Sequence, residues 1–221
     1  MRTTYQSEQE QLESLQKWWK ENGKAVIFGV LLGVIGIIGW SSWQAYSVRQ
    51  AEKASLGYEK LVTSMGDNAF EEAIAQGESL VDAFPDAGYG AFASLIAAKA
   101  AFERNDSEKA KASLRRVIDQ GGFPIIGLVA RLRLARLLAS EQKWTEALAL
   151  LDGDAGAFSS LYEEARGDIF LAQGNIDEAR SAYGRSLTHG GRLADKMLRE
   201  RIGVKLSDLG NAPRLAETSD T

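Results

Sequence analysis

The sequence predicts an all-α protein in which a single N-terminal transmembrane helix precedes a solenoid of helix pairs, closed by a C-terminal capping helix. An uncharged apolar run predicts the transmembrane helix, and a helix-start pattern that recurs four times predicts the solenoid. No segment shows sustained alternation of apolar and polar residues with β-branched side chains, so we expect no strands.

Between Lys24 and Arg49 lie 24 consecutive residues without a formal charge. At about 1.5 Å of rise per helical residue, 25–43 spans about 29 Å, the thickness of a bilayer's hydrocarbon core. A cleavable signal peptide has a shorter apolar region followed by small residues, whereas this run ends in tryptophans. We therefore predict an uncleaved transmembrane helix over 25–46, after a tail over 1–24. Indoles are expected near both membrane interfaces: Trp18, Trp19, Trp40 and Trp43.

Small residues recur along one face of the predicted membrane helix, at steps of 4, 4, 3 and 3 residues. They are Ala25, Gly29, Gly33, Gly36 and Gly39. Small residues let a second helix approach closely within lipid, which predicts contact with another membrane protein or with a second copy of this chain. The alternative is that glycine is simply common in membrane helices.

Charge and composition exclude several classes of function. The net charge is −4 and no basic stripe occurs, so nucleic acid is not an expected partner. Cysteine is absent, which excludes disulfides and thiolate chemistry.

Three basic residues flank each end of the apolar run, so the positive-inside rule does not decide the orientation. A short tail inside and a long exported domain is the preferred topology.

A short pattern ending in Glu/Lys–Ala marks the start of a helix four times after the membrane segment. The aligned alanines are 37, 37 and 32 residues apart, close to the repeat length of about 34 in tetratricopeptide arrays. These alanines are Ala73, Ala110, Ala147 and Ala179. The predicted membrane helix continues outward to about Met65, where Gly66-Asp67-Asn68 ends it. The repeat domain is therefore expected over 47–209.

Residues of fixed size recur around the aligned alanines. Twelve residues earlier stand small residues, Ala98, Ala135 and Gly167, and four residues later stand large ones, Leu114, Leu151 and Tyr183. Such a pattern lets paired helices cross closely and interlock. The first repeat departs from it, because Gly77 stands where a large residue is expected. Helical spacing of apolar residues predicts the capping helix, at Leu198, Ile202, Leu206 and Leu209, and 210–221 reads as a disordered tail.

The chain as a whole resembles the YfgM-type ancillary SecYEG translocon subunit family. The resemblance lies in the Glu/Gln-rich start at residues 5–16, the Lys17-Trp18-Trp19 element, the membrane helix, the degenerate repeats and the ending Lys205-Leu206-Ser207-Asp208-Leu209. It implies a bacterial inner-membrane protein with its tail in the cytoplasm and its repeats in the periplasm. It also implies partners: the SecYEG translocon, a membrane-anchored prolyl-isomerase-like chaperone, and exported polypeptides that the protein helps to fold.

An enzyme is the competing class, and the residues give it little support. His189 is the single histidine, no Gly-x-Ser-x-Gly motif occurs, and no phosphate-binding loop is present. We expect His189 to be a polar residue at a helix end. The sequence predicts a protein without catalytic activity, cofactor or metal.

Binding is the expected role of the repeats, on the concave face lined by the first helix of each pair. Register predicts these groove residues: Phe92, Leu95, Lys99, Phe102, Val129, Leu132, Arg136, Leu161, Glu164 and Asp168. Apolar members are expected to hold client side chains or to be plain core residues, and Lys99 and Arg136 to meet carboxylates. We expect an acidic, apolar-lined groove, which would favour basic or unfolded clients, although a net charge of −4 is too small to steer them. Two alternatives remain: a regulator acting through Leu12, Leu15 and Trp18-Trp19 of the tail, and an assembly factor for another inner-membrane complex.

Overall fold

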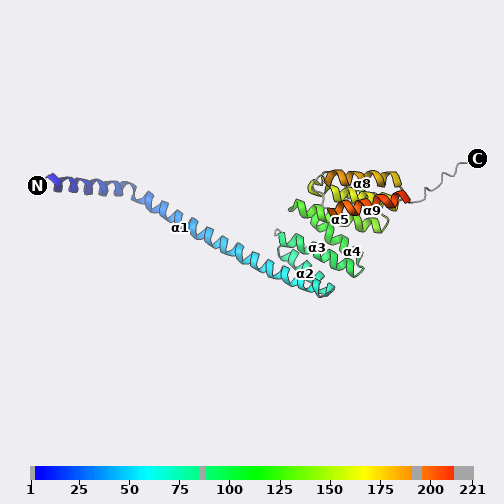
Figure 1. The fold of residues 1–221 in the computed structure, drawn as a ribbon. Helices are drawn as coiled ribbons and strands as arrows, with labels where there is room; N and C mark the ends of the chain where they lie inside the picture. Colours follow the sequence, from blue (N-terminus) through cyan, green and yellow to red (C-terminus); the bar gives the residue numbers. More distant parts are fainter. Residues whose placement is uncertain (1–2, 85–87, 191–195, 212–221) are drawn as a thin grey trace, which may run out of the picture. The chain divides into compact units, whose positions relative to one another are not determined.

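The computed structural model describes residues 3–84, 88–190 and 196–211. Within these ranges it contains helices and no strand, which confirms the predicted all-α class. The elements are α1 (Thr3–Gly66), α2 (Phe70–Ala83), α3 (Gly88–Glu103), α4 (Ser107–Gln120), α5 (Pro124–Ser140), α6 (Trp144–Leu150), the short η1 (Gly156–Phe158), α7 (Ser159–Ala172), α8 (Ile176–Gly190) and α9 (Lys196–Asn211). The chain forms two units, Met1–Lys53 and Ala54–Thr221, with the division inside α1 (Figure 1).

The first unit consists of the greater part of α1, which is long and apolar enough to cross a membrane. Its apolar window is not buried by any other part of the described chain. The side chains of Trp18, Trp19, Trp40 and Trp43 are exposed, and a Cβ added to Gly29, Gly33, Gly36 or Gly39 would meet nothing within 4 Å. The helix therefore presents an uncovered apolar surface, which a bilayer or a partner helix would cover. The packing role of its small residues stays a prediction.

The second unit is a stack of helix pairs, as predicted (Figure 1). The last turns of α1, from Ala54 to Gly66, form the first helix of the first pair, with α2 as the second. Ser64 of α1 donates to Gln76 of α2 at 3.2 Å, and a Cβ on Gly57 would lie 2.4 Å from Leu80 Cδ1. The following pairs are α3 with α4, α5 with α6, and α7 with α8. The continuation of the membrane helix to the Gly66 region is confirmed. The predicted tail over 210–221 contributes its first two residues to α9, and its remainder lies outside the described residues.

The same turn joins the two helices of every pair. Each turn has one residue with positive φ, namely Asn68, Asn105, Gln142 and Gly174. At each turn, the amide of the positive-φ residue donates to the carbonyl three residues earlier (Asn105 N to Phe102 O at 2.9 Å). The amide of the next residue donates to the carbonyl five residues before it (Asp106 N to Ala101 O at 2.9 Å). This is the Schellman arrangement, which satisfies the last carbonyls of a helix while reversing the chain.

The aligned alanines are among the most deeply buried residues of the stack, each at most 1% exposed. Leu114, Leu151 and Tyr183 are buried as well, as the size pattern predicts. In the last pair, a Cβ on Gly167 would lie 2.4 Å from the Cε1 atom of Tyr183, so only glycine allows the ring to lie there without displacement. The repeat register is therefore confirmed.

The third pair is shortened, because α6 ends after two turns at Leu150. Two arginines bind the chain that follows it. Arg131 Nε donates to the carbonyl of Leu150 at 2.9 Å, and Arg166 donates to the carbonyl of Leu151 at 2.8 Å. These charge-assisted bonds compensate carbonyls that a longer helix would have satisfied, which explains how a spacing of 32 residues fits the stack.

The capping helix is also confirmed. Ile202 and Leu209 of α9 are buried in a second small core with Ala179 and Tyr183 of α8. Leu198 and Leu206 pack against the same core. The last pair would otherwise leave this apolar surface in water, because a solenoid has no following repeat at its end.

Lys111 on α4 is an unusual buried cation that links two repeats. It is 2% exposed, and its Nζ donates to Glu108 at 2.6 Å and to both carboxylate oxygens of Glu141 at 2.8 Å. Glu141 also binds Ser107 and Lys143. Hydrogen bonds with Glu108 and Glu141 hold the pKa of Lys111 above its ordinary value. Hydrogen bonds from Lys111, Lys143 and Ser107 lower the pKa of Glu141 from 4.5 to about 2.

Replacing Gly167 with alanine is expected to destabilise the last pair. The added methyl group would displace the Tyr183 ring, and such overpacking costs about 1–3 kcal/mol in the free energy of unfolding. Gly184→Ala on α8 is the matched control, since nothing lies within 4 Å of its added Cβ. There the gain in helix propensity is expected to stabilise the protein by about 0.5–1 kcal/mol. Urea denaturation of both variants measures the difference; equal stabilities would contradict the packing account.

Replacing Glu141 with glutamine is expected to lower the melting temperature at neutral pH and to leave it unchanged in strong acid. The folded-state pKa of Glu141 is depressed, so its contribution is present above the ordinary pKa of 4.5 and is lost as the pH falls towards about 2. Thermal unfolding followed by circular dichroism, from pH 7 to pH 2, measures the gap between variant and parent. A gap of constant size across this window would show that the carboxylate charge is not its cause.

Candidate functional site

A groove crosses the faces of α3, α5 and α7. One part of it is a pocket of about 420 Å³ between α3 and α5, with two residues of α4 in its lining, here called the α3–α5 pocket. Helical spacing places its lining residues on shared faces, because residues three and four apart lie side by side on a helix. The lining consists of Ala98, Lys99, Phe102, Ala110, Leu114, Arg133, Arg136, Leu137 and Ser140.

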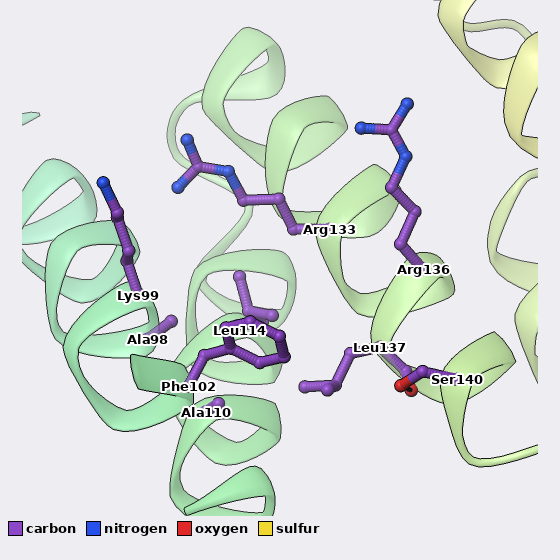
Figure 2. Close-up of a pocket in the computed structure, with 9 residues that line it drawn as sticks. All are labelled: Ala98, Lys99, Phe102, Ala110, Leu114, Arg133, Arg136, Leu137 and Ser140. Carbon is purple, nitrogen blue, oxygen red and sulfur yellow. Dashed lines mark hydrogen bonds between the residues drawn. The ribbon is translucent and has the colours of Figure 1, made fainter. Parts of the chain in front are cut away.

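The base of the α3–α5 pocket is apolar (Figure 2). Leu114 and Leu137 are buried beneath it and belong to the main core. Phe102 differs from them, because its side chain is 56% exposed and its ring lies over the pocket. An aromatic ring that is left this open provides apolar surface to a ligand without any rearrangement of the core.

Three cationic side chains rise around this base, Lys99 from α3 and Arg133 and Arg136 from α5 (Figure 2). Arg133 donates to the carbonyl of Leu95 at 3.3 Å, and desolvation lowers the pKa of its guanidinium. Among the described residues, no Asp or Glu lines the pocket and no carboxylate pairs with any of the three cations. The pocket is therefore a positively charged site in a chain of net negative charge.

A second pocket, of about 490 Å³, continues the groove between α5 and α7. Arg136 and Ser140 line both pockets, so the two are adjacent parts of one groove. Trp144 and Asp168 also line this α5–α7 pocket. Asp168 already accepts a hydrogen bond from the Tyr183 hydroxyl at 2.7 Å and is paired with Lys205 of α9 at 2.5 Å.

The structure brings four of the predicted groove residues to these pockets: Lys99, Phe102, Arg136 and Asp168. Val129 and Leu161 are partly buried against the main core. Phe92 is exposed but lies elsewhere, in an aromatic cluster with Tyr58, whose ring centroid is 6.4 Å away.

Three predicted groove residues are not on the groove surface. Leu95 and Leu132 are buried in the main core, where neighbouring helices cover them. Glu164 is 2% exposed because Arg201 of α9 binds both of its oxygens at 2.7 Å and Lys205 binds it at 3.0 Å. Burial alone would raise the pKa of Glu164, but the hydrogen bonds from Arg201 and Lys205 bring it below its ordinary value. Its role is to fasten the capping helix.

Sequence reasoning missed Arg133, Leu114 and Leu137 as pocket residues. The signal was present on α5, since Arg133 and Leu137 lie three residues before and one after Arg136. The predicted face, through Leu132 and Arg136, is rotated by about one residue from the observed one. The expectation of an acidic groove is wrong for the α3–α5 pocket, whose charged lining residues are all basic.

His189 lies in the last turn of α8 and is exposed, at a small pocket that Arg166 and Tyr162 also line. In the described ranges, no group of three or more His, Asp and Glu side chains is arranged to hold a metal ion.

Comparison with known proteins agrees with this architecture. A family model described as a tetratricopeptide repeat-like domain matches residues 16–211, which include the apolar part of α1 and all helix pairs. A solved Podospora anserina protein with TPR-like repeats of kinesin light chain type superposes with a TM-score of 0.55 at 13% identity, over 72% of this chain and 86% of that one. At this identity the likeness concerns the fold alone.

Curated relatives carry the name "Ancillary SecYEG translocon subunit". The Escherichia coli protein is 33% identical over 81% of this chain and 86% of its own length. The Haemophilus influenzae protein is 30% identical over 88% of this chain and 96% of its own, and the Neisseria gonorrhoeae protein 28% over 91% and 97%. This chain therefore belongs to the ancillary SecYEG translocon subunit family, with a tetratricopeptide repeat-like domain.

Proposed function

We propose that the protein is an ancillary subunit of the Sec protein-export translocon and acts as a scaffold and chaperone-like helper for exported polypeptides. In this proposal α1 spans the bacterial inner membrane once, the tail lies in the cytoplasm and the repeat domain lies in the periplasm. The observation that carries the proposal is the match to translocon subunits across the apolar helix and the repeats together. A match confined to the repeats would support only a binding domain.

The groove supports a binding role for the repeat domain rather than a purely structural one. Its two pockets combine an exposed Phe102 ring with Arg136 and Trp144. Phe102 does not belong to the main core, whereas Trp144 packs partly against that core and also lines the α5–α7 pocket. Exported chains, and the membrane-anchored prolyl-isomerase-like chaperone that the resemblance implies, are the proposed occupants.

One observation favours a second role, in which the tail binds a cytosolic partner. Leu12, Leu15 and Trp19 are exposed and fall on one face of α1 at helical spacing. An exposed apolar stripe on a helix is a common recognition element for a partner groove.

A photo-crosslinking residue at Phe102 is expected to capture exported polypeptides or a periplasmic chaperone in membranes that are translocating protein. The same residue at Arg115, which is exposed on α4 and lines neither groove pocket, is the control and is expected to capture much less. Mass spectrometry of the adducts identifies the partners. Equal capture at both positions, or none at Phe102, would overturn the scaffold role, whereas capture only from Leu15 in the tail would favour the regulator.

Replacing Gly33 with leucine is expected to reduce co-purification of SecYEG in mild detergent, because the side chain would hold a partner helix away from the small-residue face. Ile38→Phe adds bulk on roughly the opposite face, at 100° per residue, and should leave recovery unchanged. Equal recovery of SecYEG with both variants would contradict a packing role for the glycines and favour the alternative that glycine is simply common in membrane helices. Recovery of a different inner-membrane complex in place of SecYEG would favour the assembly factor.

A further inference from the structure

The sign of the charge in the α3–α5 pocket is opposite to that of the whole chain. The chain has a net charge of −4, yet Lys99, Arg133 and Arg136 all extend over one apolar base (Figure 2). Most basic residues at helix interfaces of this domain have a carboxylate partner, as Lys111 has in Glu141 and Arg116 has in Asp82. The three pocket cations have none within the described ranges.

We propose that the α3–α5 pocket binds an acidic–apolar segment of a polypeptide. One apolar side chain of the segment would lie against Phe102, Leu114 and Leu137, and carboxylates on its flanks would bind Lys99, Arg133 and Arg136. This inference rests on the proposed function, since it names the chemistry of the segment that the groove would take from an exported chain.

The size and lining of the pocket support this occupant. Its volume of about 420 Å³ falls within the range of about 300–1,000 Å³ that is usual for ligand pockets. Aliphatic and alanine side chains form most of its base, with Phe102 as the only aromatic lining residue that the structure describes. A nucleic acid would require stacking surfaces and a longer basic track along the backbone. A peptide requires one apolar contact and nearby charge.

The arrangement of the cations also favours carboxylates. Arg133 and Arg136 lie one helical turn apart on α5, and guanidinium groups bind carboxylates through paired hydrogen bonds. Desolvation already lowers the pKa of Arg133, so a carboxylate would supply the charge partner that its surroundings lack. Asp168, in the adjoining α5–α7 pocket, does not fill this role, because Tyr183 and Lys205 already bind it.

Fluorescence anisotropy with three labelled peptides tests the proposal. The probes are a short peptide with a central leucine flanked by glutamates, the same peptide flanked by lysines, and the glutamate peptide with serine in place of leucine. The full chain is held in nanodiscs of zwitterionic lipid, so that anionic lipid does not compete. We expect the glutamate–leucine peptide to bind at least about tenfold more tightly than either other peptide. Stronger binding of the lysine peptide, or equal binding of the serine peptide, would overturn the proposal.

Charge reversal in the pocket sharpens the test. Arg136→Glu is expected to weaken binding of the glutamate peptide by about tenfold or more and to strengthen binding of the lysine peptide. Misfolding would not produce such a gain in affinity. Phe102→Ala is expected to reduce the advantage of leucine over serine. Arg115→Glu makes the same charge change on α4 outside the pocket and should leave the order of the peptides as in the parent. An equal effect at Arg115 would mean that overall charge, and not the pocket, sets the preference.

The outcome is separable from that of the proposed function. Association with the translocon is measured by co-purification of SecYEG with the parent chain, without any peptide. A parent that co-purifies with SecYEG but shows no preference for the glutamate–leucine peptide would overturn this inference alone. A parent that prefers the peptide but does not associate with SecYEG would overturn the proposed function and leave the pocket's chemistry intact.

Discussion

The close approach of the two helices in each pair is the constraint on which the rest of the repeat domain depends. Ala73, Ala110, Ala147 and Ala179 are buried at the start of each second helix, and the Schellman turn before each one sets the direction of the chain. Residues that fill this crossing cannot also face solvent. Only the remaining faces of α3, α5 and α7 are therefore available to form a groove, and the repeat packing decides which side chains reach it.

The first pair obeys the same constraint with the sizes exchanged. Leu61, twelve residues before Ala73, is fully buried where the other pairs have a small residue, and Gly77 stands where they have a large one. A Cβ on Gly77 would lie 2.8 Å from that of Ala97 on α3. The glycine thus lets the next pair approach closely, so the departure from the repeat pattern is a different solution of the same packing problem. The total volume at a crossing matters more than which helix supplies it.

Register and helix boundaries were predictable because they depend on local periodicity. The four helix starts and the capping helix follow from residues within one repeat of each other. The role of Glu164 was not predictable in this way. Its partner Arg201 lies 37 residues away on a helix with no repeat counterpart, so a residue at an expected groove position became a buried anchor for the cap. On α5, the observed groove face differs from the predicted one by about one residue, so Leu132 lies in the core and Arg133 lines the pocket.

Net charge was a poor guide to the groove for a related reason. A net charge of −4 gives only the excess of acidic over basic residues. Opposite charges that pair between helices cancel locally, so they contribute little to the electrostatic potential at a binding surface. Lys111 is neutralised by Glu108 and Glu141, and Glu164 by Arg201 and Lys205. What remains at a given surface depends on which residues the packing leaves unpaired. At the α3–α5 pocket these are three cations, and because surface potentials decay within about 10 Å at moderate salt, a nearby ligand responds to them rather than to the total.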